Sequence, residues 1–478
     1  MNKPNLISTN SNRWLALDVL RGLSIFGMIF SAIVPKGVLP GWMYHVQNPP
    51  PTHHLNLTIP GISWVDWVFP IFIFCMGVAI PLACRKKAEN MREFFYHLFI
   101  RFVMLWAFAY LVTILGSSGL TGKLNLVLFN VRVRGYELYI FVFLGFLALF
   151  ALYWRAKPSS KRKWIRVAGV SVILGIIALF HWGYGAQINL HKRSIILLLL
   201  AFLYLFGSLI WYISRNSLWR RVTLFITVVA ISFWSKESGF DQWLYGNKSL
   251  SWVFNMEEIY FLLILIPATW VGDYMSGNLG WRGQKSIITH SPPVGHLFYL
   301  FLGLLIGFLC FGLYQRWNEL LIIVVSLSVL CLCLIICRNS SKALFPLITL
   351  AAALLLVGLL MDSYEGGIKK VPATFSYCFT MGGISILLLL FFHYLCRLFP
   401  GSFFVRIFSG AGANPLLSYV AFGSFVMPVL HLTFLVGLYN AAYPQGEPWL
   451  GVVRGFVIVL LTMYLVSILS KKGVFWRC

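Results

Sequence analysis

The chain is 478 residues long, 59% of them hydrophobic and only 11% charged, with a mean hydropathy of +0.81. A soluble protein carries roughly 25% charged residues, and a core of this size could not hide so much apolar surface. Composition therefore excludes a soluble globular protein and indicates a membrane protein whose apolar excess faces lipid. The formal net charge of +24 leaves two explanations, nucleic-acid binding or orientation in a bilayer.

Fourteen apolar segments follow one another along the chain, and most are long enough for a spanning helix of roughly 20 residues. In chain order they cover residues 14–34, 62–84, 96–115, 136–154, 167–182, 195–213, 222–234, 253–274, 294–314, 319–337, 343–361, 374–396, 410–436 and 450–469. The segment 222–234 is short, so we expect between 11 and 14 crossings. We find no soluble insertion and no internal repeat, which predicts an all-α, polytopic membrane helix bundle built as one domain over residues 1–478.

The connections alternate between two sides, and most of the 38 Lys and Arg residues fall on one of them. The basic runs at residues 85–87 and 161–163 both lie on that side. Cytoplasmic loops of membrane proteins are enriched in Lys and Arg, so we predict that both termini are cytoplasmic. The charge then orients the protein, and we expect no nucleic-acid partner.

Charged groups inside apolar segments are costly and therefore informative. In the first segment, Asp18 and Arg21 are three residues apart, which places them on one face of a helix where they can pair. An arginine that snorkels and only sets the depth of the helix explains the pair equally well.

The longest connection on the predicted outer side covers residues 35–61 and holds three histidines, His45, His53 and His54. The consecutive prolines at 49–51 fix φ and disfavour a helix, so we expect an ordered cap or a re-entrant loop. Histidine most often acts as a general base near neutral pH, but a loop histidine can also be solvated and idle. The spacing of these histidines fits no recognised metal-ligand pattern, and we predict no metal.

Asp66 lies in the first turn of the second predicted helix, directly after this loop. An N-cap at Ser63 and a favourable carboxylate in the first turn would explain Asp66 structurally. The helix begins on the same side as the histidine loop, so the carboxylate could also orient an imidazole and raise its basicity.

Three polar groups in later segments are further candidates for ligand contacts. Glu257 and Glu258 open the eighth segment on the outer side, and Asn414 precedes Pro415 in the thirteenth. A buried amide must find hydrogen-bond partners in the protein or contact a ligand.

Several stretches together resemble the heparan-α-glucosaminide N-acetyltransferase family of membrane acetyltransferases, in a bacterial branch of it. The dense part is residues 17–23 (Leu-Asp-Val-Leu-Arg-Gly-Leu) with residues 61–77, which contain Asp-Trp-Val-Phe-Pro. Residues 267–273, a proline leading to Gly-Asp, and residues 414–419, Asn-Pro-Leu-Leu-Ser-Tyr, are separate islands of similarity.

The resemblance implies an enzyme that moves an acetyl group from cytoplasmic acetyl-CoA, its co-substrate, to a glucosamine-type amine on the opposite side of the membrane. It also implies one essential histidine on that far side, for which His45 is the first candidate, His53 the second and His54 the third. Asp66 would hold the catalytic imidazole. The candidate contacts to substrate or acetyl-CoA are Asp18, Arg21, His54, Glu257, Glu258 and Asn414.

Two other functions are compatible with the composition. A secondary transporter of a sugar or other small solute would suit the many helices, although it should show internal repeats with broken helices. A non-catalytic subunit of an envelope polysaccharide machine would use the histidine loop only for packing. The expected partners are the lipid bilayer, acetyl-CoA and a glucosamine-containing saccharide, and the oligomeric state stays open, a homodimer being one arrangement.

Overall fold

The computed structural model describes residues 14–115, 127–128, 131–132, 135–155, 160–183, 185, 194–247, 250–277, 295–340, 343–444 and 446–477. Nearly all of its secondary structure is helical, apart from one pair of two-residue antiparallel strands. The elements in chain order are α1 (Leu15–Ile33), η1 (Gly41–Met43), α2 (Trp64–Cys84), η2 (Lys87–Glu89), α3 (Met91–Ile114), β1 (Val127–Leu128), β2 (Val131–Arg132), α4 (Tyr136–Tyr153), α5 (Ser160–Ala178), η3 (Leu179–Gly183), α6 (Ile195–Ser214), α7 (Leu218–Glu237), α8 (Phe240–Gly246), α9 (Glu257–Tyr260), α10 (Leu262–Met275), α12 (His296–Gln315), α13 (Glu319–Ser340), α14 (Phe345–Tyr364), α15 (Phe375–Leu398), α16 (Phe403–Gly412), α17 (Pro415–Ala421), η4 (Phe422–Val426), α18 (Met427–Leu432), α19 (Val436–Ala441) and α20 (Pro448–Lys471).

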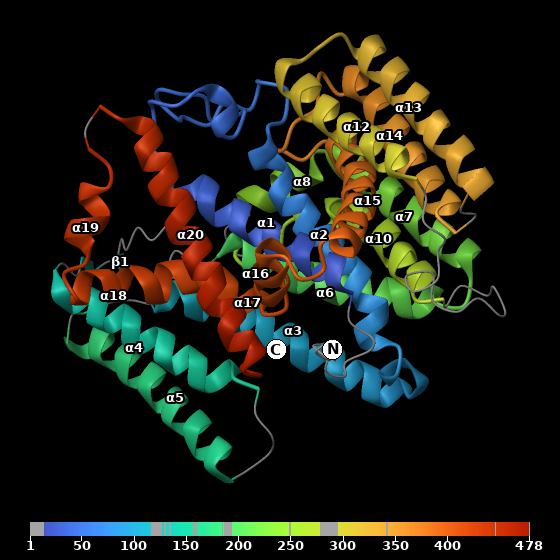
Figure 1. The fold of residues 1–478 in the computed structure, drawn as a ribbon. Helices are drawn as coiled ribbons and strands as arrows, with labels where there is room; N and C mark the ends of the chain where they lie inside the picture. The colour runs from blue at the N-terminus through green and yellow to red at the C-terminus, as the bar shows by residue number, and fades with distance from the viewer. Residues whose placement is uncertain are drawn as a thin grey trace, which may run out of the picture.

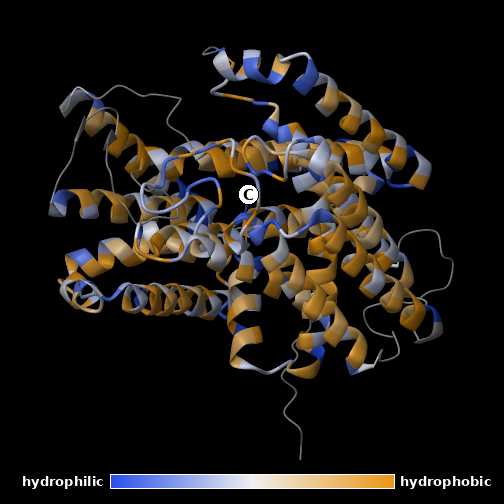
Figure 2. Ribbon diagram, turned by 90° about the horizontal axis from the view of Figure 1, so that it is seen from above, coloured by the Kyte–Doolittle hydropathy of each residue, from blue (hydrophilic) through white to orange (hydrophobic). Residues whose placement is uncertain are grey.

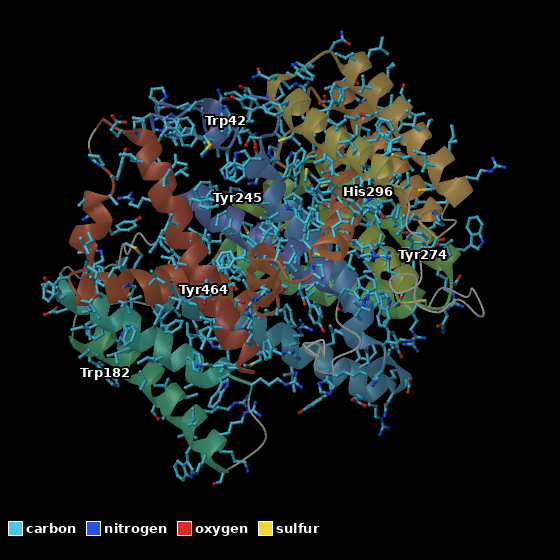
Figure 3. All side chains as sticks on the ribbon, in the orientation of Figure 1. Trp42, Trp182, Tyr245, Tyr274, His296 and Tyr464 are labelled. Atoms are coloured by element: carbon cyan, nitrogen blue, oxygen red, sulfur yellow. The ribbon has the colours of Figure 1, made fainter. Side chains whose placement is uncertain are left out.

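Within these described ranges, fourteen helical stretches are long and apolar enough to cross a membrane. This confirms the predicted polytopic bundle. Hydrophobic residues dominate the helices, and hydrophilic ones gather mainly at their ends and in the connections (Figure 2). Large aromatic side chains such as Trp42, Trp182 and Tyr464 are exposed on the outside of the bundle (Figure 3). The protein is therefore an integral membrane protein, because such a surface requires lipid.

The predicted segment 222–234 is too short. It is the middle of α7, which has 20 residues and begins after Ser217, whose side chain accepts a hydrogen bond from the Arg220 backbone N–H. The polar residues at both ends of α7 lower the local hydropathy without breaking the helix, so an apolar window misses them.

The predicted segment 410–436 is not one helix. Its first residues belong to α16, which ends at Gly412, and α17 begins at Pro415. Proline is well suited to the first position of a helix and cannot continue a preceding one, so the chain breaks at Ala413 and Asn414.

Four spanning stretches, one of which consists of α9 and α10, form the centre of the bundle. The spanning stretches of α15 and of α9–α10 are 94% and 83% buried, those of α1 and α2 are each 72% buried, and that of α5 is only 22% buried. In Figure 1, α1, α2 and α15 run through the middle, with α4 and α5 on one side and α12, α13 and α14 on the other. The central helices place the polar groups described below.

Residues 35–61 form a loop, called the cap below, that contains a single 3₁₀ turn, η1. The cap has a small core around Leu39, Met43 and Tyr44. The Tyr44 hydroxyl donates to the Pro35 carbonyl at 2.6 Å and accepts from the Leu39 N–H at 3.1 Å. The cap reaches the start of α20, where Trp42 and Trp449 lie with ring centroids 6.4 Å apart (Figure 1).

The close crossing of α1 and α16 depends on two glycines. A Cβ on Gly22 would lie 2.1 Å from the Phe408 carbonyl oxygen, and a Cβ on Gly412 would lie 1.8 Å from the Asp18 carbonyl oxygen. Small residues let helix backbones approach closely in membranes, where van der Waals packing drives association. Neither contact can relax without moving a backbone.

We expect Gly22→Ala to lower the free energy of unfolding by about 1–3 kcal/mol, because its methyl group forces α1 and α16 apart. Thermal denaturation of the purified protein in detergent measures this loss. Gly307→Ala is the matched control, since that glycine also lies inside an apolar helix and its Cβ would meet nothing within 4 Å. Equal melting temperatures for the two variants would contradict the expectation.

Candidate functional site

Asp66 is held in the first turn of α2 by a capping box. Ser63 is the N-cap, and its side chain accepts a hydrogen bond from the Val65 N–H. In return, the Asp66 Oδ2 accepts the Ser63 backbone N–H at 3.1 Å. This reciprocal arrangement satisfies helix N–H groups that would otherwise lack partners. The structural explanation of Asp66 is therefore correct, and it uses only one carboxylate oxygen.

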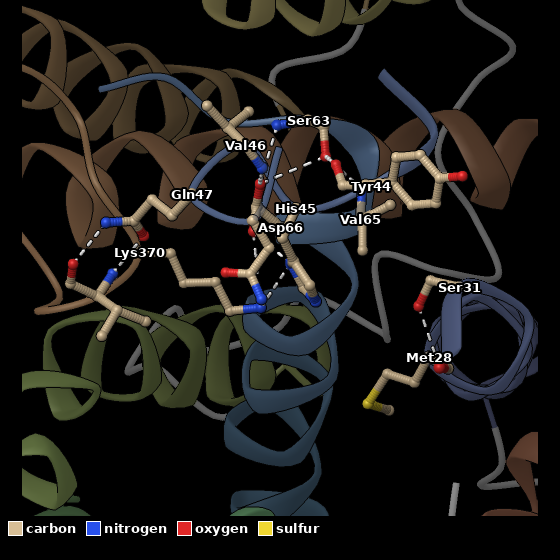
Figure 4. Close-up of polar contacts among 12 residues, drawn as sticks. Met28, Ser31, Tyr44, His45, Val46, Gln47, Ser63, Val65, Asp66 and Lys370 are labelled. Carbon is tan, nitrogen blue, oxygen red and sulfur yellow. Dashed lines mark hydrogen bonds and ion pairs between the residues drawn. The ribbon is translucent and has the colours of Figure 1, made fainter. Parts of the chain in front are cut away.

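The second oxygen of Asp66 holds His45. The distance from His45 Nδ1 to Asp66 Oδ1 is 2.6 Å, and the Val46 backbone N–H lies 3.3 Å from Oδ2 (Figure 4). A carboxylate accepts hydrogen bonds, so Nδ1 carries the proton and Nε2 bears the lone pair. Among the described residues, no hydrogen-bond partner reaches Nε2, and 39% of the His45 side chain is exposed. This geometry leaves a basic nitrogen available to a substrate.

Lys370 is the third charged group of the cluster. It lies in the connection between α14 and α15, and its Nζ is 3.3 Å from His45 Nδ1 and 3.7 Å from Asp66 Oδ1 (Figure 4). Burial lowers the pKa of His45 from its ordinary value of 6.5, and the nearby Lys370 charge lowers it further, while Asp66 acts in the opposite direction. Burial also lowers the pKa of Lys370, against the attraction of Asp66. Since the pKa of His45 is lowered from 6.5, the imidazole is neutral at pH 7.

The backbone around Lys370 is fixed by the cap. The Gln47 side chain forms two hydrogen bonds with Val371, donating to its carbonyl at 2.6 Å and accepting its N–H at 2.9 Å. The Gly61 N–H donates to the Ile368 carbonyl at 2.7 Å. These contacts join residues more than 300 positions apart, and they bring Lys370 to the dyad formed by His45 and Asp66.

The other side of the same connection is fixed by hydrogen bonds to charged side chains. Arg316 donates to Asp362 Oδ2 at 2.7 Å, and the other Asp362 oxygen accepts the Ile368 N–H. Glu365 accepts the N–H groups of the first residues of α15, Phe375 and Ser376, at 2.9 and 2.7 Å. A carboxylate is favourable at a helix N-terminus, so this end of α15 is well satisfied.

A proline in α2 creates the contact between the dyad and α15. Pro70 has no N–H, so the carbonyl of Asp66, four residues earlier, loses its partner within the helix. The Tyr377 hydroxyl donates to that carbonyl at 2.7 Å, and Tyr377 is fully buried. A buried carbonyl left unpaired would cost about 1–3 kcal/mol.

His53 and His54 lie elsewhere in the cap. His53 has a positive φ of 53°, its Nε2 accepts the Gly37 N–H at 2.8 Å, and its Nδ1 is 3.1 Å from the Asn48 carbonyl. Both ring nitrogens of His53 therefore serve the fold of the cap. His54 is exposed, and its backbone N–H lies 3.5 Å from the Thr52 hydroxyl.

Asp18 and Arg21 pair as predicted. They lie at the end of α1 that is farther from the cap and the dyad. Arg21 NH1 lies 3.4 Å from Asp18 Oδ1 and 3.2 Å from the Gly412 carbonyl, and NH2 is 3.4 Å from the Cys75 carbonyl. The arginine is turned into the bundle and connects α1 with α2 and α16. About 22 Å of helix separates Asp18 from Ile33, the end of α1 that leads to the cap.

Of the remaining candidates, Glu258 and Asn414 have partners within the fold. Glu258 is buried and accepts the Asn255 N–H at 2.7 Å, and Glu257 is the first residue of α9. The Asn414 side chain donates to the Val474 carbonyl at 2.9 Å and accepts the Trp476 N–H at 3.0 Å. Asn414 thus fastens the chain end beside α17, and neither it nor the two glutamates joins the dyad.

Two observations concern possible metal ligands and cysteines in the described part of the chain. No group of three or more His, Cys, Asp or Glu side chains there could hold a metal ion. The eight cysteines in these ranges are free, and Cys478 lies outside them.

Sequence reasoning missed Lys370, Gln47 and Tyr377. Lys370 stands in a short outer connection that holds two adjacent lysines, which by itself indicates only a solvated turn. The spacing of Asp66 and Pro70 did carry a signal, because it predicts an unpaired carbonyl and hence a buried donor. Which residue supplies that donor follows only from helix packing.

The fold and this cluster define a polytopic helical membrane protein with a histidine–aspartate dyad where its cap meets the bundle. The chain belongs to the family described as a domain of unknown function (DUF5009), which matches residues 13–275. His45 and Asp66 fall within the matched range, whereas Lys370 lies beyond it. No curated protein matches this chain.

We expect Tyr377→Phe to lower the free energy of unfolding by about 1–3 kcal/mol, because it leaves the Asp66 carbonyl unpaired. Adding Pro70→Ala should restore much of this loss, since the new N–H at position 70 can donate to the same carbonyl. Thermal denaturation of the two variants in detergent checks the prediction. A double variant no more stable than Tyr377→Phe would show that the hydroxyl has another role.

The His45 imidazole should react with diethylpyrocarbonate down to pH values below 6.5. The reagent attacks the neutral ring, and reactivity is lost as the pH falls through the lowered pKa of His45. Lys370→Met should move the midpoint to higher pH, because it removes a repelling charge. Mass spectrometry of the peptide that contains His45 measures the midpoint, and an unchanged value in Lys370→Met would contradict the electrostatic coupling.

Proposed function

We propose that this protein is a membrane-embedded acetyltransferase that moves an acetyl group from cytoplasmic acetyl-CoA to an amino sugar of the glucosamine type on the opposite side of the membrane. The observation that supports this most strongly is the dyad. His45 donates through Nδ1 to Asp66 Oδ1 at 2.6 Å, and its side chain is 39% exposed. The resemblance of residues 17–23 and 61–77 to membrane acetyltransferases supplies the reaction.

The chemistry requires a base beside the acceptor amine. The amine must lose a proton as it attacks the thioester carbonyl, and a neutral imidazole can take that proton. The imidazole could instead attack the thioester first and carry the acetyl group transiently. In both routes Asp66 fixes the tautomer and stabilises the imidazolium that forms, as in other histidine–aspartate dyads.

The distribution of charge supports the orientation. The cap and the connection that holds Lys370 lie on the same side when the fourteen crossings alternate, and the basic residues 85–87 lie on the other. Under the positive-inside rule the basic side faces the cytoplasm. We therefore propose a bacterial inner membrane, cytoplasmic termini, and a dyad that faces away from the cytoplasm.

The test uses inside-out membrane vesicles that enclose glucosamine and receive labelled acetyl-CoA from outside. We expect wild-type vesicles to form N-acetylglucosamine. His45→Gln and Asp66→Asn should each lower the rate by roughly 10²–10⁴-fold, because one removes the base and the other its correct tautomer. Asn at position 66 can still accept the Ser63 N–H, so the cap of α2 is retained.

The matched control is His97→Gln. His97 lies on α3, away from the cap, and pairs at the surface with Glu93 at 3.6 Å, so we expect wild-type rates. Full activity in both dyad variants would refute the assignment, and activity lost only in His53→Gln would move it to His53. Accumulation of unmodified sugar without any acetylated product would identify a transporter instead.

A further inference from the structure

A largely buried lysine beside a general base needs an explanation. The Lys370 side chain is only 21% exposed, and its ammonium lies 3.3 Å from the imidazole that should act as the base. Burying an ammonium is costly, and a cation at this position weakens the base.

The dyad does not provide hydrogen-bond acceptors for all N–H groups of the Lys370 ammonium. It cannot donate to His45 Nδ1, because that nitrogen already carries the proton shared with Asp66. Its distance of 3.7 Å to Asp66 Oδ1 exceeds a hydrogen bond, although the charges still attract. Lys370 therefore has N–H groups available for an acceptor that is not part of this dyad.

The backbone on both sides of Lys370 is also fixed by hydrogen bonds. Gln47 holds the next residue, Val371, through both of its amide atoms. The Lys369 N–H donates to the Thr374 hydroxyl at 3.1 Å, and the Thr374 N–H donates back to the Lys369 carbonyl at 3.1 Å. Such preorganisation is what charge stabilisation in a transition state requires, because no reorganisation is then needed during the reaction.

We infer that Lys370 is a catalytic residue that donates a hydrogen bond to the oxyanion formed when the thioester carbonyl is attacked beside His45. This inference rests on the proposed acetyl transfer. Both routes, direct transfer and an acetyl-histidine intermediate, pass through such an oxyanion.

In the direct route the acceptor nitrogen forms a bond to the carbonyl carbon, and the carbonyl π electrons move to the oxygen. His45 Nε2 takes the N–H proton, and the Lys370 ammonium binds the negative oxygen. The carbonyl then re-forms, the C–S bond breaks, and the CoA thiolate leaves with the proton from His45 Nε2.

A purely electrostatic partner of Asp66 would behave differently. The charged groups facing His45 are Asp66 on α2, Lys370 in the α14–α15 connection and Lys36 in the cap. If Lys370 only lowers the pKa of His45, its removal moves the acid limb of the pH profile to higher pH and leaves the plateau kcat unchanged. An oxyanion ligand must also lower the plateau.

The experiment measures kcat and KM for acetyl-CoA and glucosamine with purified protein in detergent, between about pH 5 and pH 9. We expect Lys370→Met to lower the plateau kcat by roughly 10²–10³-fold, the usual loss when an oxyanion donor is removed, with little change in either KM. Lys369→Met makes the same change of charge on the neighbouring residue and should match the wild type.

Lys370→Arg keeps the charge but moves the donors, so its plateau should fall between those of the wild type and Lys370→Met. If Lys370→Met does not fold, Lys370→Arg provides the test. A plateau kcat equal to that of the wild type in Lys370→Arg then overturns the inference. An unchanged plateau in Lys370→Met also overturns it, while the acetyltransferase proposal stands. If wild-type protein transfers no acetyl group, the proposed function fails and the inference fails with it.

Discussion

The Asp66 carboxylate is shared between the fold and the candidate site. Oδ2 completes the capping box of α2 with Ser63, and Oδ1 holds the Nδ1 of His45 at 2.6 Å. The carbonyl of the same residue, left unpaired by Pro70, accepts the Tyr377 hydroxyl from α15. One residue therefore joins the start of α2, the cap and the most buried helix, so the imidazole cannot move independently of the bundle.

The cap and the α14–α15 connection form the outer part of this arrangement. Each leaves backbone groups without helix partners, and at a membrane surface such groups must be satisfied by protein or water. Gln47 and Gly61 satisfy those of Val371 and Ile368. The hydrogen bonds that make the loops ordered are thus the same ones that place Lys370 beside the dyad.

The opposite end of α1 has a separate set of polar contacts. Arg21 connects three helices, Gly22 and Gly412 allow α1 and α16 to touch, and Asn414 fastens the chain end. These groups have their partners within the protein, which is the usual requirement for polar groups in a bilayer. Arg21, Gly22 and Asn414 lie in the stretches that carry the family resemblance, and in this structure they hold together the bundle that carries the dyad.

The sequence by itself determined the class of the protein, and it indicated that Asp66 could hold one histidine of the loop that precedes it. Apolar segments of about 20 residues predict crossings because a bilayer demands that length, and only boundaries with polar flanks or an Asn-Pro break went wrong. Asp66 and the histidine loop were predicted to meet because they are neighbours in the chain. The sequence could not choose between His45 and His53, since the choice depends on how the cap folds. Only the tertiary structure shows that Lys370 and Tyr377 contact the dyad. Contacts between residues more than 300 positions apart depend on helix packing, and no local sequence pattern predicts them.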